Sequence, residues 1–400
     1  MSDLSGDALQ QLLACGQSYW LDNLTRRMIT SGELAYWIRQ RGLRGITANP
    51  TTFRDAVASP DYDQDIASLV QNGCSTKDVY EALLVADVQQ ACDLLYAVYS
   101  TSDGLDGFVS LEVSPYLAHD SAATIAEARR YVERVNRPNL CIKIPATDAG
   151  IPAIEQLLYK GIAINITLLF SIPSYQAVIE AYLSALERRL TDHLSVKKIT
   201  SVASFFVSRI DVLVDQLLLR RIPVDDQARQ SLAARLQGRS AIANAKLAYR
   251  TFRQAFTSER WARLAAAGAR VQRPLWASTG TKNRAYRDVV YVDSLVGRDT
   301  VNTMPEATLR AFADHGRVKA DAVETDLEQA ELVMQQLEKT GISFNCVTWQ
   351  LEHEGVQKFV DAYDSALQTL DDKRRQVIQA RSASRSSKHR RGSTGRKTKT

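Results

Sequence analysis

The sequence predicts an α/β protein that forms a single closed (β/α)8 barrel, or TIM barrel, with extra helices before the seventh strand and at the C-terminus. Eight short β-rich runs are mostly separated by helical segments, which favours parallel strands joined by right-handed crossovers. The eight units form one unbroken series, and 400 residues lie within the range of one such barrel. Polar side chains recur where strands end, and barrels of this class carry their chemistry there.

The strands are predicted from runs rich in Val, Ile, Leu and aromatic residues that end at Pro or polar residues. They are residues 18–23, 43–50, 108–115, 140–147, 162–170, 198–206, 274–279 and 288–295. Apolar residues at three- and four-residue spacing predict the intervening helices. These are one helix that begins at Thr30 or Ser31 and stops at Gly42, two within 62–100, and one each at 121–136, 148–161 and 173–190. An amphipathic segment at 4–13 precedes the first strand.

Two further helical regions exceed what a minimal barrel needs. Residues 207–267 carry more helix than one barrel unit requires, and three helical segments from 305 to about 376 are expected to wrap the outside. We therefore assign residues 1–372 to the barrel. Residues 373–400 form a basic, Ser/Thr-rich tail that is expected to be disordered.

The net charge of +5 hides a division along the chain. The 28 residues from Lys373 hold 11 Lys and Arg and no Asp or Glu, so the other 372 residues carry 39 basic and 45 acidic side chains. A mildly acidic body thus ends in a tail of charge +11. This tail is either a solvated extension, which its composition favours, or a weak tether to nucleic acid or another polyanion.

Composition also bounds the cellular setting. No run approaches the ~18 consecutive apolar residues of a membrane helix, and the N-terminus lacks the basic-then-apolar layout of a signal peptide. Five scattered cysteines without a CxxC pair indicate reduced thiols, and the five histidines share no ligand spacing, so no metal site is predicted. We expect a soluble, cytoplasmic protein with no membrane partner.

Ten polar residues stand at or just beyond the predicted strand ends. They are Asp22, Asn49, Glu112, Lys143, Asn165, Thr167, Ser204, Arg209, Ser278 and Lys282. For a single Asn or Thr, a hydrogen-bonded top layer of the barrel is a sufficient explanation. Lys143 is different, because it lies inside the apolar strand Cys141-Ile142-Lys143-Ile144-Pro145, and a buried ammonium needs a partner or must lose its proton.

A deprotonated lysine is a nucleophile. Its free pKa of about 10.4 would have to fall to about 7–8 for attack on a carbonyl at neutral pH, a change of roughly 4 kcal/mol that burial and neighbouring groups can supply. The pattern makes Lys143 a candidate Schiff-base lysine. Asp22 and Glu112 would be its acid/base pair, and they would supply the proton for the water of the imine reaction.

Seven blocks of the sequence resemble transaldolases, in series and in order. They are SYWLDNLTRRMITSGEL, GITANPTTF, VSLEVSPYLAHD, CIKIPATDAGIPAIEQLLYKGIAINITLLFS, SFFVSRID, WASTGTKN and VNTMPEATL. The resemblance extends from about residue 17 to 370 and is most similar to the long bacterial form, which has extra helix before the WASTGTKN block. The Lys143 block and INITLLFS are the most specific.

The resemblance implies a pentose-phosphate enzyme that moves a dihydroxyacetone unit between sugar phosphates without a metal or organic cofactor. Sedoheptulose 7-phosphate and glyceraldehyde 3-phosphate would interconvert with erythrose 4-phosphate and fructose 6-phosphate. By the same resemblance, Lys143 matches the Schiff-base lysine and Asp22 the acid/base aspartate. Glu112 and Thr167 match the pair that hold the reacting water.

The resemblance also assigns the residues that bind substrate. Asn49, Asn165 and Ser204 match residues that hold the dihydroxyacetone hydroxyls, and Arg209 matches a phosphate-binding arginine. Family members carry a second arginine near the position of Ser278, and here Lys282 would take that role. Phe170, Phe205 and Phe206 are expected to line dry walls of the site.

Two alternatives use the same residues differently. A Schiff-base aldolase would release free dihydroxyacetone and would need no acceptor aldehyde. A catalytically silent barrel would serve as a scaffold bound to polyanions, although every catalytic position here holds a competent side chain.

Overall fold

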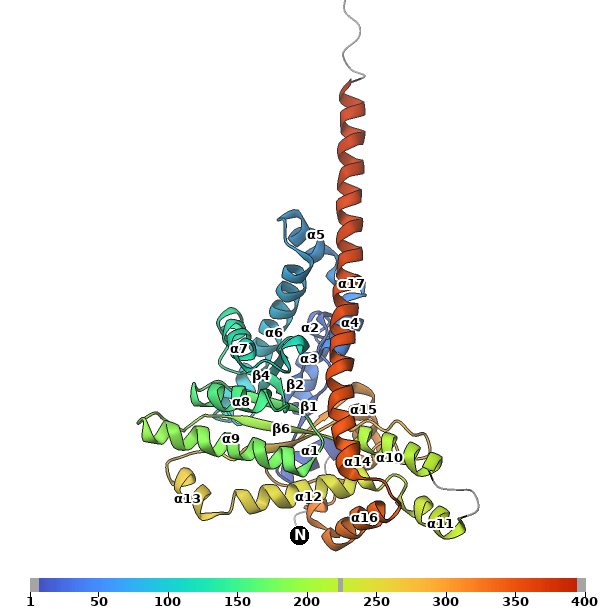
Figure 1. Cartoon of the computed structure of the whole chain (residues 1–400). Coiled ribbons are helices and arrows are strands. Elements are labelled where there is room, and N and C mark those ends of the chain that lie inside the picture. Colours follow the sequence, from blue (N-terminus) through green and yellow to red (C-terminus); the bar gives the residue numbers. More distant parts are fainter. Residues whose placement is uncertain (1–6, 222–225, 394–400) are drawn as a thin grey trace, which may run out of the picture.

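Eight parallel strands close into a barrel in the order of the sequence (Figure 1). The computed structural model describes residues 7–221 and 226–393. Closure comes from β1 and β8, which pair in register from Gln17 with Thr300 to Leu21 with Met304. The strands are β1 Gln17–Leu21, β2 Gly45–Thr47, β3 Phe108–Glu112, β4 Leu140–Pro145, β5 Ile164–Leu169, β6 Ser201–Phe206, β7 Arg273–Ala277 and β8 Thr300–Met304. The predicted TIM barrel is therefore confirmed.

The prediction of the eighth strand was wrong. Residues 288–295 contain the short helix α14 (Val290–Ser294), and the strand that closes the barrel, Thr300–Met304, follows it. The run from Val289 to Val292 has the β-branched, apolar composition of a buried strand. Periodicity does not separate a short buried helix from a buried strand. In the fold, Tyr291 and Val292 are buried as helix residues.

The helices from α1 to α9 include the predicted ones, together with α2, which was not predicted. They are α1 Ala8–Ala14, α2 Arg26–Thr30, α3 Glu33–Tyr36, α4 Pro50–Val57, α5 Asp63–Gln71, α6 Thr76–Thr101, α7 Ser121–Val135, α8 Gly150–Tyr159 and α9 Ile172–Thr191. The helix expected to run unbroken to Gly42 instead begins after Gly32 and continues from α3 into a π-helical segment, Trp37–Arg41. Its stop at Gly42 is confirmed, where a φ of 82° requires a residue without Cβ.

Four helices lie between β6 and β7 in the described part of the chain, as the excess of helical sequence predicted. They are α10 Ser208–Arg221, α11 Gln227–Leu236, α12 Ser240–Ala255 and α13 Glu259–Ala266. Helix α12 is buried on nearly all sides, including the continuous run 243–249 and Phe252. Residues 222–225, which the sequence also assigns to this region, lie outside the described residues.

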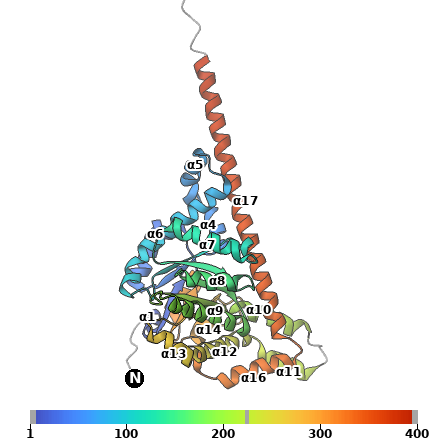
Figure 2. The same cartoon turned by 60° about the vertical axis from the view of Figure 1, so that its left-hand side comes forward.

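In the described residues, three α-helices follow the barrel: α15 Glu306–His315, α16 Leu327–Lys339 and α17 Phe344–Ser393. Figures 1 and 2 show α17 crossing the body beside α4 and continuing beyond it. The composition predicts a disordered tail from residue 373, whereas the structure has helix as far as Ser393, and no proline follows Pro305 to interrupt it. Residues 394–400 lie outside the described residues. The division of the chain after residue 372 stays a prediction.

Candidate active site

A cavity of about 280 Å³ opens at the carboxyl ends of the strands. It gathers seven of the ten residues predicted from the strand ends: Asp22, Asn49, Lys143, Ser204, Arg209, Ser278 and Lys282. The other three, Glu112, Asn165 and Thr167, are buried in the barrel wall next to them. Parallel strands end on one side of a barrel, so side chains far apart in sequence converge there.

Lys143 and Glu112 form a buried ion pair. The register of β3 and β4 places the two residues directly beside each other, and Lys143 Nζ lies 3.2 Å from Glu112 Oε2. Lys143 is 5 % exposed and Glu112 8 % exposed. Burial raises the pKa of Glu112, and the charge of Lys143 opposes part of that rise. A carboxyl group with a raised pKa next to an amine is suited to exchange protons with it.

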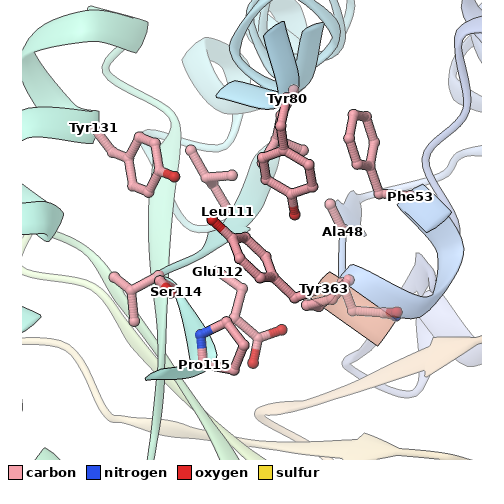
Figure 3. Close-up of a pocket in the computed structure, with 13 residues that line it drawn as sticks. Ala48, Phe53, Tyr80, Leu111, Glu112, Ser114, Pro115, Tyr131 and Tyr363 are labelled. Carbon is pink, nitrogen blue, oxygen red and sulfur yellow. The ribbon is translucent and has the colours of Figure 1, made fainter. Parts of the chain in front are cut away.

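Aromatic side chains keep Glu112 away from bulk water on its other side. Figure 3 shows Glu112 in a small pocket with the rings of Tyr80, Tyr131 and Tyr363, which come from α6, α7 and α17. The pocket holds about 10 Å³, close to the space of one water molecule. This surrounding explains why the carboxyl group of Glu112 is desolvated.

Asp22 follows β1 directly and is held by two donors. Its Oδ1 accepts a hydrogen bond from Thr47 Oγ1 at 2.7 Å and one from Asn49 Nδ2 at 3.3 Å. Thr47 in turn lies 3.0 Å from the hydroxyl of Thr303 on β8. Both donors bind the same oxygen, so the carboxylate is fixed in orientation while it lines the cavity that also contains Lys143.

A hydrogen-bonded chain crosses the base of the site. Ser204 donates to Asn165 Oδ1 at 2.6 Å, and Asn165 Nδ2 donates to Ser110 Oγ at 3.0 Å. Thr167 Oγ1 is buried and has no hydrogen-bond partner among the residues that the structure describes. A buried hydroxyl without a protein partner is suited to bind water, which matches the role that the resemblance assigns to Thr167.

Two cationic side chains line the same cavity. Arg209 is partly buried, and its Nη1, which is buried, has no partner within the described part of the chain. Burial lowers the pKa of Arg209, while the carboxylates of Asp22 and Glu112 act in the opposite direction. Lys282 lies in the loop after β7 and also reaches the cavity. A desolvated guanidinium with a free donor and a second cation are suited to bind a phosphate group.

Seven residues that line the cavity were not predicted as site residues, and three of them, Thr47, Thr303 and Phe359, lie next to predicted ones. Thr47 stands two residues before Asn49, and Thr303 belongs to the true eighth strand, so the strand-end rule would have found both with correct boundaries. Phe359 comes from α17, and its ring centroid lies 5.4 Å from Lys143 Nζ. No local signal connects a residue of the C-terminal helix with a lysine more than 200 residues earlier.

The prediction that three phenylalanines line the site was correct for one of them. Phe206 lines the cavity, but Phe205 and Phe170 do not. Side chains alternate along β6, so Ser204 and Phe206 share one face and Phe205 the other. Phe205 accordingly packs against Tyr175 and Trp276 outside the cavity.

No group of three or more His, Cys, Asp and Glu side chains placed to hold a metal ion occurs in residues 7–221 and 226–393. Within the same ranges, no helix has the length and apolar character that a membrane span requires. All five cysteines are free thiols.

Residues 19–370 match the family model described as Transaldolase/Fructose-6-phosphate aldolase. The chain is 46 % identical to Transaldolase 2 of a Nostoc species over 370 residues, which cover 91 % of this chain and 97 % of that protein. Transaldolase 2 of Nostoc punctiforme is 46 % identical over 375 residues, 92 % of this chain and 98 % of that protein. Transaldolase 2 of Streptomyces coelicolor is 45 % identical over 366 residues, 91 % of this chain and 96 % of that protein.

Proposed function

Since the chain belongs to the transaldolase/fructose-6-phosphate aldolase family and is a transaldolase of the pentose phosphate pathway, we propose that Lys143 forms the Schiff base with its ketose substrate. The observation that carries this assignment is the buried contact of Lys143 Nζ with Glu112 Oε2 in a cavity that also contains Asp22. A lysine with one acidic neighbour in a desolvated site is arranged for imine chemistry.

Imine formation needs an amine nucleophile and a proton donor for the departing water. After the Lys143 ammonium passes a proton to Glu112, its amine attacks the carbonyl carbon of the ketose, and the hydroxyl of the resulting carbinolamine leaves as water with that proton from Glu112. The partnerless hydroxyl of Thr167 assists by holding that water. The iminium that results withdraws electrons from the adjacent carbon–carbon bond.

Cleavage and transfer then depend on Asp22. Its carboxylate takes the proton of the C4 hydroxyl as the C3–C4 bond breaks, so the aldose leaves as an aldehyde and a three-carbon enamine stays on Lys143. The enamine adds to the acceptor aldehyde, and Asp22 returns the proton to the new hydroxyl. Hydrolysis of the second imine releases the product and the free lysine. The fixed orientation of Asp22 Oδ1 by Thr47 and Asn49 serves this proton transfer.

The substrates are sugar phosphates, as the family implies. We assign the reaction of sedoheptulose 7-phosphate and glyceraldehyde 3-phosphate to give erythrose 4-phosphate and fructose 6-phosphate. Arg209 and Lys282 would bind the phosphate group, and Asn49, Asn165, Ser204 and Ser278 would bind hydroxyl groups. The binding energy of a remote phosphate would orient the reacting carbons. Such charged metabolites, together with the reduced thiols, favour a cytoplasmic enzyme.

Borohydride trapping tests transfer chemistry in the intact protein. Fructose 6-phosphate followed by reductant is expected to leave a reduced three-carbon adduct on the peptide that contains Lys143. Addition of erythrose 4-phosphate before the reductant is expected to discharge the adduct and produce sedoheptulose 7-phosphate. An adduct that resists the acceptor while free dihydroxyacetone accumulates would instead identify an aldolase. A folded protein without any adduct would support the silent scaffold.

We also propose that the basic C-terminal segment binds polyanions weakly. Lys373 donates hydrogen bonds to Ser59 O and the carboxylate of Asp63 on the body, so a truncated protein should retain Lys373. Removal of residues 381–400 deletes eight Lys and Arg and is expected to lower the salt concentration at which the protein leaves a heparin column, with unchanged activity. A full-length variant with Gln at those eight positions should behave like the truncation. Equal retention of all three proteins would refute polyanion binding.

A further inference from the structure

The loop that carries Lys282 is hydrogen-bonded to one face of the helix that carries Arg209. Helix α10 presents Ser208, Asp211 and Asp215, a set that we call the anchor strip. Their spacing of three and then four residues places them on one side of the helix. Residues 278–289 connect β7 with α14 and include Lys282, and this loop and the start of α14 contact the strip.

Each residue of the anchor strip contacts a different part of the loop. The hydroxyl of Ser208 lies 2.9 Å from that of Ser278 at the start of the loop. Tyr286 donates from its hydroxyl to Asp215 Oδ2 at 2.6 Å. In α14, which follows the loop, the Tyr291 hydroxyl donates to Asp211 Oδ2 at 2.9 Å. The loop is therefore held at its beginning and near its end, and the helix that follows it is held as well.

The carboxylates of Asp211 and Asp215 also accept hydrogen bonds through their other oxygen atoms. The backbone N–H of Ala241 donates to Asp211 Oδ1 at 2.8 Å, and that of Gly238 donates to Asp215 Oδ1 at 3.0 Å. Gly238 has a φ of +67°, and a Cβ there would come within 2.6 Å of the Tyr286 ring. The extra helices before β7 thus form the support on which the loop rests.

Asp211 and Asp215 are buried but do not line the catalytic cavity. Burial raises the pKa of Asp211 to about 7 and also raises the pKa of Asp215. Buried carboxyl groups are costly unless their oxygens are bonded, and here all four oxygens accept a hydrogen bond. Asp211 and Asp215 lie outside the cavity and are fully hydrogen-bonded, so they are suited to position other residues.

We infer that Tyr286 and Tyr291, through Asp215 and Asp211, position the Lys282 loop relative to Arg209 and so set the preference for phosphorylated over unphosphorylated ketoses. The inference rests on the proposed phosphate contacts of Arg209 and Lys282. Arg209 and Lys282 would both have to contact one phosphate group. A displaced loop would weaken phosphate binding without altering Lys143, Glu112 or Asp22. Tyr286 and Tyr291 are positioning residues in this scheme.

Tyr286→Phe tests the inference because it removes one hydroxyl and keeps the ring that packs on Gly238. The KM for fructose 6-phosphate is expected to rise about five- to tenfold, with kcat changed less than about twofold. The kcat/KM for unphosphorylated fructose is expected to stay the same. Tyr159→Phe is a matched control, because its hydroxyl donates to Asp192 at 2.7 Å on the surface. Melting curves verify folding, and Tyr291→Phe carries the same test should Tyr286→Phe not fold.

Lys282→Ala separates this inference from the proposed function. If Lys282 binds phosphate, Lys282→Ala raises the KM for fructose 6-phosphate, and adding Tyr286→Phe to it has no further effect. A Lys282→Ala variant with the parental KM would refute the phosphate contact itself. With that contact established, an unchanged KM in folded Tyr286→Phe, or equal losses with both ketoses, would overturn the positioning role.

Discussion

Lys143→Ala is expected to lower transaldolase activity by about 10⁴-fold or more and to abolish the borohydride-trapped adduct. The amine of Lys143 holds the three-carbon unit between the two half-reactions, and the other amine of the cavity, on Lys282, is assigned to the phosphate group. Removal of Lys143 leaves Glu112 buried without its partner. Its raised pKa allows that carboxyl group to take up a proton, so the fold is expected to survive with a lower melting temperature.

Lys246→Ala provides a matched control for the loss of a buried lysine. Lys246 lies on α12 away from the cavity, and its Nζ donates to Thr325 O at 2.7 Å. This variant is expected to lose stability while it keeps both the adduct and the specific activity of the folded protein. An adduct that persists on another lysine of the Lys143→Ala protein would contradict the assignment of the nucleophile.

Asp22→Asn is expected to separate imine formation from carbon–carbon cleavage. The amide oxygen can still accept hydrogen bonds from Thr47 and Asn49, so the local geometry should be kept. Without a carboxylate base, proton removal from the C4 hydroxyl is lost, and turnover should fall by about 10²–10⁴-fold. Reduction in the presence of fructose 6-phosphate should then trap the intact six-carbon ketose on Lys143. The mass of the modified peptide distinguishes this adduct from the three-carbon one.

Asp55→Asn controls for a change of charge near the site. Asp55 is exposed on α4, close to Asp22 but outside the catalytic cavity. It is expected to leave both turnover and the three-carbon adduct unchanged. A three-carbon adduct formed at the parental rate by Asp22→Asn would remove Asp22 from the cleavage step.

Much of the site could be predicted because the chemistry of a barrel follows its strand ends. An ammonium inside the apolar run from Cys141 to Pro145 is costly unless it is used or paired, and that conflict is visible in the sequence. The resemblance supplied roles for the residues around it. The cavity then brings Lys143, Asp22 and Arg209 together because parallel strands place their carboxyl ends on one side.

The boundary between helix and strand at residues 288–304 was decided by the tertiary structure. The valine-rich run at 289–292 has the local composition of a strand, but barrel closure requires a partner for β1 in the register from Gln17 with Thr300 to Leu21 with Met304. Pairing of residues 283 positions apart is a non-local interaction, and local propensity does not encode it. The error also concealed Thr303, which contacts Thr47 and thereby the support of Asp22.

The sequence by itself determined the barrel, the family, and the set of polar groups available for catalysis, because periodicity and strand ends are local features. Only the tertiary structure decided which groups meet. It placed Phe359 of α17 over Lys143, turned Phe205 away from the cavity, and fastened the Lys282 loop to Asp211 and Asp215. These contacts join segments separated by tens to hundreds of residues, and their geometry depends on the packing of whole helices against the barrel.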